Sequence, residues 1–107
     1  MTKIVVDPGI CGFTAVVEVT RLSARRIRVV IDSDCETAGG MNGDLEDLDL
    51  KLALGPLADS LVYKIAARHG GHTACPIPMA ILKAIEVETG AALPQDVIIH
   101  FEATDPR

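Results

Sequence analysis

Aromatic residues are nearly absent from this 107-residue chain, which has no tryptophan and only Tyr63, Phe13 and Phe101. Its core must therefore be built from Val, Ile, Leu and Ala, and an apolar content of 49% excludes a disordered protein. The first residues predict no secretory signal, and no apolar run reaches the roughly 18 residues that cross a bilayer. We therefore expect a cytoplasmic protein with no membrane partner, folded as a single domain over residues 1–107.

Positive charge is also scarce. Ten Lys and Arg against fifteen Asp and Glu give a formal net charge of -5. Binding to nucleic acid requires clustered cations that neutralise phosphates. The one basic cluster falls around a predicted hairpin turn, where a solvated face is the ordinary explanation; it contains Arg21, Arg25, Arg26 and Arg28. We expect no nucleic-acid partner.

Three segments near the start of the chain predict β-strands. Residues 4–6 form a short apolar run that ends in the turn residues Asp7, Pro8 and Gly9. Residues 13–20 and 26–32 alternate between apolar and polar positions, which predicts a hairpin around residues 22–24. The residues predicted to face the core are Phe13, Ala15, Val17, Val19, Ile27, Val29 and Ile31. A last strand is predicted at residues 97–101, with Val97, Ile99 and Phe101 on its core side.

The middle of the chain has helical spacing. Leu45, Leu48 and Leu52 predict a short helix that ends near Gly55, and a second helix follows from Pro56 to the Gly70-Gly71 pair. A third helix is predicted from Pro76 or Pro78 to Gly90. The order βββαααβ predicts an α+β fold, in which a mostly antiparallel four-stranded sheet carries about three helices on one face.

Three cysteines concentrate the chemistry of this chain. An odd number in a reducing compartment argues against a disulfide framework. The residues predicted to be buried have odd numbers in both strands of the hairpin. A three-residue turn at 22–24 then places Cys11 directly opposite Cys35. A turn longer by two residues would leave them diagonal neighbours. Because cross-strand Cβ atoms lie about 4.5–5.5 Å apart, both thiols could meet one ion.

The third thiol, Cys75, comes directly before the third predicted helix. Free amides and the positive end of the helix dipole stabilise a thiolate there, so Cys75 is predicted to be the most reactive sulfur. His72 precedes it by three residues, a spacing that lets both side chains bind one metal across a turn. His69 is a second candidate, although interaction with the carboxyl end of the preceding helix explains it equally well.

A local resemblance starts at the same cysteine. The run Cys75-Pro76-Ile77-Pro78 resembles the CPxP motif of TusA-type sulfur carriers, small α/β proteins in which the motif's cysteine carries a persulfide at a helix start. Those carriers place the motif after their first strand, whereas here it follows three strands and two helices. Only the sulfur environment of Cys75, Pro76 and Pro78 is therefore carried over. The whole chain resembles a family of short uncharacterised cysteine-containing proteins of anaerobic bacteria and archaea.

Three functions are consistent with these residues. The leading hypothesis is a metal-binding protein in which Cys11, Cys35 and Cys75, with His72 or His69 as fourth ligand, hold zinc or an iron–sulfur cluster. The first alternative is a sulfur-relay or thiol-redox protein with Cys75 as the reactive thiol. The second is a non-catalytic dimeric binding module whose cysteines are inert, since free cysteine often behaves as a small buried hydrophobe. Whether the protein is an enzyme is left open.

The outward face of the predicted sheet indicates a partner. Val5, Val16, Val30 and Ile98 fall on that face, where a water-facing sheet would carry polar residues. Exposed apolar patches mark interaction surfaces, and two-fold pairing is the commonest way to cover one. We predict a homodimer, with another protein partner as the alternative. The competing explanation is that a helix crosses to this face and covers it within one chain.

Overall fold

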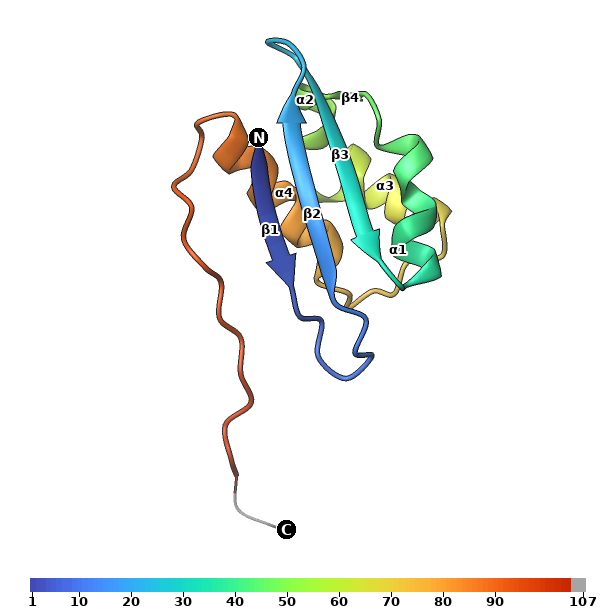
Figure 1. Ribbon diagram of the computed structural model, residues 1–107, viewed down its shortest axis with the longest axis vertical. Coiled ribbons are helices and arrows are strands. Elements are labelled where there is room, and N and C mark those ends of the chain that lie inside the picture. The colour runs from blue at the N-terminus through green and yellow to red at the C-terminus, as the bar shows by residue number, and fades with distance from the viewer. Residues whose placement is uncertain (105–107) are drawn as a thin grey trace.

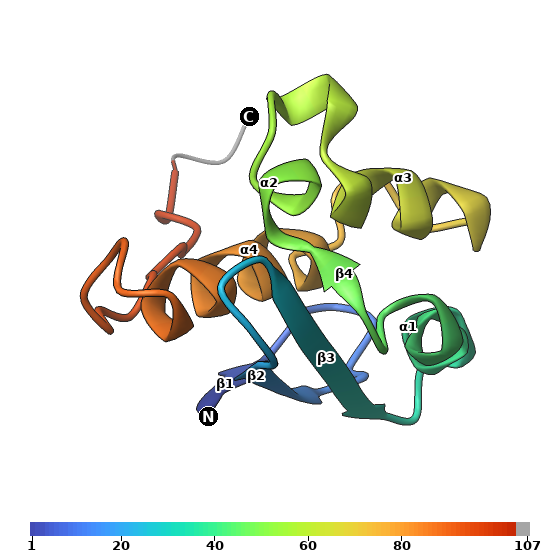
Figure 2. The same ribbon diagram turned by 90° about the horizontal axis from the view of Figure 1, so that it is seen from above.

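The computed structural model describes residues 1–104 and contains a four-stranded antiparallel sheet with helices packed on one face (Figures 1 and 2). The predicted α+β class is confirmed. In sheet order the strands are β1 (Thr2–Val6), β2 (Ala15–Arg21), β3 (Arg26–Ser33) and β4 (Leu48–Asp49). The α-helices are α1 (Glu36–Gly40), α2 (Leu50–Ala53), α3 (Leu61–Arg68) and α4 (Ile77–Glu88), and two 3₁₀ turns are η1 (Met41–Asp44) and η2 (Leu57–Asp59).

The alternating residues of the hairpin build the core, as predicted. Six of them are buried beneath the helices, namely Ala15, Val17, Val19, Ile27, Val29 and Ile31. The prediction was wrong for Phe13, which precedes β2 and is 45% exposed. A strand pattern therefore locates the buried face more reliably than the first residue of the strand.

The register of the hairpin differs from the prediction by two residues. Ala15 pairs with Ser33 and Arg21 with Ile27, and the amide of Leu22 donates to the carbonyl of Arg26 at 2.8 Å. The centre of the turn therefore lies one residue later than predicted. Both registers bury the same side chains because a shift of two preserves the faces, so burial alone does not select between them.

The outer edge of β3 is occupied by the segment that follows it. The side-chain amide of Asn42 accepts from the backbone of Ile31 at 2.7 Å and donates to its carbonyl at 2.8 Å. The carbonyl of Leu45 accepts from Val29 at 2.9 Å, and β4 pairs with the start of β3. The helix predicted through Leu45, Leu48 and Leu52 is formed only in its second half: α2 contains Leu52 and ends before Gly55, whereas Leu48 lies in β4 and Leu45 follows η1. Both Leu45 and Leu48 are buried, and α1 is a helix that the sequence did not predict.

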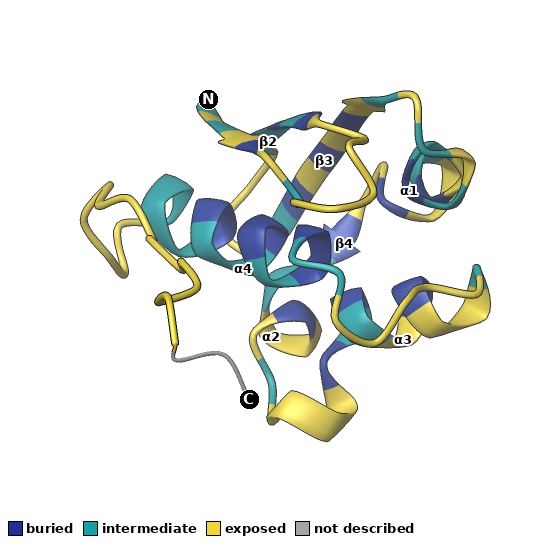
Figure 3. Cartoon of the chain, turned by 90° about the horizontal axis from the view of Figure 1, so that it is seen from below, coloured by how far each residue is buried: buried dark blue, intermediate teal, exposed yellow. Residues whose placement is uncertain are grey.

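Helix α4 covers β1 and β2 and agrees with the predicted third helix. Its residues Ile77, Ile81 and Ile85 are buried against the sheet, and the buried faces of α3 and α4 turn inward in Figure 3. The carboxylate of Glu88, at the end of α4, accepts from the hydroxyl of Thr2 at 2.8 Å and the amide of Arg21 at 3.0 Å. These bonds fix α4 antiparallel to β1.

The strand predicted at residues 97–101 is not formed. This segment is part of a tail that runs from the end of α4 past β1 and away from the body (Figure 1). Val97, Ile98, Ile99 and Phe101 are between 48% and 102% exposed. Strand propensity alone does not order a segment, because a strand needs a neighbour for its backbone hydrogen bonds.

The second face of the sheet carries no helix among residues 1–104, so the competing explanation, a helix that crosses to this face, was wrong (Figure 2). Val5 lies opposite Val16, while Val30 lies opposite Glu18, and Ile98 is outside the sheet. The apolar patch is therefore smaller than the sequence predicted. Throughout the described part of the chain, every helix is too short or too polar to cross a membrane.

Candidate functional site

Cys75 lies where the sequence placed it, at the entrance to α4. Its amide donates to the carbonyl of His72 at 3.0 Å, which closes a turn, and Pro76 is the N-cap of the helix. Pro78 occupies the first turn, where the missing N–H of proline leaves no intrahelical bond unmade. The Cys75 side chain is half-buried and packs against the core.

A shallow depression of about 480 Å³ opens beside Cys75. Its polar lining includes Cys75, His72, Tyr63 and Lys64. Leu57 of η2 forms part of the apolar wall. Sequence reasoning missed Tyr63 and Lys64; the available signal was the helical spacing of α3, which places both on the flank that faces the turn before α4.

Cys35 is the N-cap of α1, directly after β3, and is half-buried. Its amide donates to Ser33 Oγ at 3.2 Å, and its carbonyl accepts from Gly39 at 2.9 Å. Ser33 Oγ in turn donates to the carbonyl of Thr14 at 2.9 Å, so the start of β2 and the end of β3 are joined beside this cysteine.

Cys11 is exposed, in the loop that connects β1 to β2. The prediction that it lies on the strand directly opposite Cys35 was wrong, because β2 begins only at Ala15. Gly9 and Gly12 flank Cys11 with φ values of 91° and 72°, a conformation that residues with a Cβ rarely adopt. A hydrogen bond of 3.0 Å joins these two glycines. The loop therefore turns sharply just where the strand was expected to continue.

The three cysteines nevertheless lie at one end of the fold. Antiparallel pairing places Val6, Ala15 and Ser33 side by side, and these residues adjoin the connections that carry Cys11 and Cys35. The first residues of α4 reach the same end, because this helix runs antiparallel to β1 and finishes beside the first residue of that strand (Figure 1).

This common location does not amount to a preassembled metal centre. Within residues 1–104, no three His, Cys, Asp or Glu side chains are arranged to hold a metal ion. The three thiols therefore share a region, and a shared ligand would require at least one of them to move.

The two candidate histidines have different surroundings. His72 is exposed at the rim of the depression beside Cys75. His69 caps α3, and its Nε2 lies 2.8 Å from Asp44 Oδ2, which also lies 3.7 Å from Arg68. His69 is thus engaged in a contact between α3 and η1, which leaves His72 as the histidine beside a thiol.

Comparison with known proteins gives a family. Residues 2–101 match the family model DUF6951, described as a family of unknown function. The chain belongs to this family. No curated protein and no solved structure matches the chain.

The DUF6951 match includes all three cysteines, both candidate histidines and the apolar part of the tail. The loop of Cys11 and the tail segment at residues 97–101 are therefore parts of the family's domain. The match assigns no chemistry to these residues.

Proposed function

We propose that Cys11, Cys35 and Cys75 bind a thiophilic metal ion, zinc or the iron of an iron–sulfur cluster, at the end of the fold that they share. One observation carries the proposal: three thiols on three separate connections lie at one end, and none is fully buried. Free cysteine is among the most buried residue types, so inert packing accounts poorly for these three and least for the exposed Cys11.

Two of the thiols are half-buried against the body of the fold and one is exposed in a loop. Cys35 is held at the junction of β3 and α1, and Cys75 at the start of α4. Cys11 is carried by an exposed loop with glycine turns on both sides. A metal bound to Cys35 and Cys75 would recruit Cys11 by moving this loop, because metal–sulfur bonds of about 2.3 Å require all the ligands to converge. Binding would thereby order the loop.

The choice of metal depends on a fourth ligand. With His72, three thiolates make a closed tetrahedral site that suits zinc, whereas three thiolates alone suit a cluster with one open coordination position. His72 is the better placed histidine because it lies beside Cys75, while His69 is bonded to Asp44. His72→Ala should therefore weaken zinc binding, and His69→Ala should leave it unchanged.

Metal and acid-labile sulfide analysis of untagged protein purified without oxygen tests the proposal. We expect stoichiometric metal in the wild type and its loss in Cys11→Ser, Cys35→Ser and Cys75→Ser. His69→Ala is the matched control that retains metal. A wild type that contains no metal, takes up none on reconstitution with zinc or iron and sulfide, and alkylates readily at all three thiols would overturn the proposal.

The depression beside Cys75 favours one second candidate, a sulfur-relay protein. In this reaction the Cys75 thiolate would attack the outer sulfur of a donor persulfide; a persulfide would form on Cys75 and the donor thiolate would leave. Lys64 and His72 line the depression and could stabilise the anionic sulfur. Incubation with a persulfide donor should then add one sulfur to Cys75 in a metal-free protein, and Cys11→Ser should leave this reaction intact. Cys11→Ser thus separates the two candidates.

A further inference from the structure

The sheet has one open edge, at β1. On the opposite side, β3 is hydrogen-bonded along its length by Asn42, Leu45 and β4. Strand β1 pairs with β2 alone, and no strand among residues 1–104 lies on its other side. An uncovered edge presents unpaired backbone N–H and C=O groups to any extended segment that can reach them.

A segment suited to such an edge exists in the same chain. Residues 97–101, Val-Ile-Ile-His-Phe, are β-branched or aromatic in four of five positions and match the five residues of β1 in length. All five are exposed in the tail. Because the exposure of four large apolar side chains to water is unfavourable, this segment would be stabilised strongly by burial.

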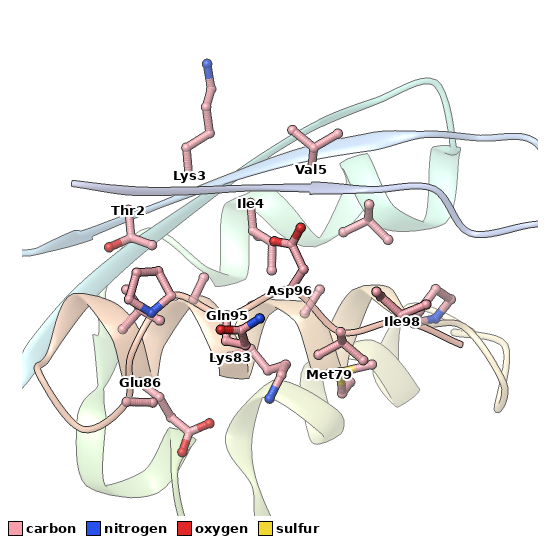
Figure 4. A pocket seen from close by; sticks show the side chains of 18 of the residues that line it. Thr2, Lys3, Ile4, Val5, Met79, Lys83, Glu86, Gln95, Asp96 and Ile98 are labelled. Carbon is pink, nitrogen blue, oxygen red and sulfur yellow. The ribbon is translucent and has the colours of Figure 1, made fainter. Parts of the chain in front are cut away.

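Figure 4 shows the groove that separates the two features. It has a volume of about 820 Å³ and lies between β1, α4 and the tail. Thr2 and Ile4 point into it, whereas Lys3 and Val5 point away (Figure 4). Met79 and other side chains of α4 form its floor. On the helix side the groove is lined by apolar residues such as Ile4 and Met79 together with Lys83 and Glu86.

The tail passes the edge of its own chain without pairing. Gln95 and Asp96 lie beside the middle of β1, and Ile98 lies beyond Val5 in the direction in which β1 ends (Figure 4). Because α4 ends beside Thr2, residues 90–96 already extend along most of β1 before the apolar segment begins. Val97, Ile98 and Ile99 still line this groove without pairing with β1, whereas His100 and Phe101 are not part of its lining.

We propose that residues 97–101 add as a fifth strand to the β1 edge of a second copy, so that two chains exchange tails in a homodimer. With Ile98 outward next to Val5, strand alternation turns Val97, Ile99 and Phe101 toward the groove on the helix side. A segment such as 90–96 spans about 23 Å when extended, which sets how far the tail can reach toward a partner. The partner's edge offers its full length, which the chain's own edge does not. This inference is independent of the thiol site.

Hydrogen exchange at several protein concentrations, combined with sedimentation, tests the exchange of tails. A reducing agent is present throughout, because the exposed Cys11 could otherwise link two chains by a disulfide. We expect a species of twice the chain mass, in which amides of residues 97–101 and 2–6 become protected together as the concentration rises. Exchange at both segments should slow by on the order of tenfold or more.

Ile99→Asp and Ala103→Asp form a matched pair of variants. Both add one negative charge to an exposed position of the tail, but only the first lies in the apolar segment. Ile99→Asp should give a folded monomer with an unprotected tail, and Ala103→Asp should remain dimeric. The proposal is overturned by a wild type that is monomeric at high micromolar concentration, whether its tail is unprotected or is protected at every concentration by its own β1. A dimer that persists in Ile99→Asp also overturns it.

Discussion

The two ends of the sheet are held in different ways. At the end where β1 begins and β2 finishes, Glu88 joins α4 to both strands and lies 3.4 Å from the terminal amine. Nearby, Arg26 and Asp47 form an ion pair at 2.7 Å. At the other end, the loop of residues 7–14 is exposed for most of its length.

This difference assigns separate roles to the two ends. At the end with Glu88, the carboxylate of this residue joins the last turn of α4 to the start of β1 and the end of β2. At the end with the cysteines, one side-chain hydrogen bond among the described residues joins the hairpin strands, from Ser33 at the end of β3 to Thr14 just before β2. A loop with few such bonds opens at low free-energy cost, which suits the proposed closure of this end around a metal ion.

The largest expected effect comes from closing the cysteine end with metal. Under the proposed function, zinc at about 1,000 times its Kd should raise the free energy of unfolding by about 4 kcal/mol, because the three thiols come together only in the folded chain. Cys35→Ala should abolish this gain while costing little in packing. Denaturant unfolding with zinc and with chelator measures both effects. A wild type that is equally stable in zinc and in chelator would contradict the prediction.

The second largest effect on stability is expected when the contacts of Glu88 are removed. Glu88→Ala should lower the free energy of unfolding by about 2 kcal/mol, because it removes hydrogen bonds to a charged group and leaves the amide of Arg21 without this partner. Glu86→Ala is the control on the same helix; its side chain has no hydrogen bond or ion pair among residues 1–104 and should change stability by about 0.5 kcal/mol or less. Equal losses in the two variants would show that Glu88 does not hold this end.

The smallest effect is a pH dependence of the same contact. The amide of Arg21, and then the hydroxyl of Thr2, hold the pKa of Glu88 below its ordinary value of 4.5. Since the folded pKa is the lower one, the stabilisation is fully present above the unfolded pKa of 4.5 and is lost as the pH falls through the folded pKa. The stability difference between wild type and Glu88→Gln should shrink across this range. A difference that stays constant as the pH falls through this range would count against the assignment.

Side-chain pattern predicted the parts of the fold in which burial alone decides the structure. Alternation identified Val17 and Val29 as core residues, and apolar spacing after Pro76 located α4. Strand pairing required more information. The two-residue shift in the register of β2 and β3 arises in the turn, where the bond from Leu22 to Arg26 selects one of two registers with identical burial.

The remaining errors in the fold depend on contacts between residues far apart in the chain. The side chain of Asn42 bonds to the backbone of Ile31, where a neighbouring strand would otherwise pair with β3. No local sequence pattern identifies an asparagine in this role. Residues 97–101 have the composition of a strand but lack a strand partner within the described chain. Glu88 resembles any acidic residue at the end of a helix until the fold brings the start of β1 and the end of β2 to it.

Contacts between distant residues also explain why only part of the candidate site was predicted. The place of Cys75 before a helix depends on its immediate neighbours, so the sequence predicted it, whereas Tyr63 and Lys64 reach the same depression from α3 and were missed. The position of Cys11 depends on where β2 begins and on the two glycine turns around it. The alternation of apolar and polar residues predicts neither the start of the strand nor these turns.

The side-chain pairing of Asn42 also affects how the protein ages. Gly43 follows it, and an asparagine before glycine deamidates readily because the unhindered backbone nitrogen of glycine attacks the side-chain carbonyl. In the fold, both polar atoms of the amide are bonded to Ile31, which restrains that carbonyl from meeting the attacking nitrogen. Deamidation would replace the NH₂ donor with an acceptor opposite the Ile31 carbonyl. We therefore expect Asn42 to deamidate mainly when β3 and η1 separate, so that opening of this contact, rather than the Asn-Gly sequence alone, would limit the chemical lifetime of the chain.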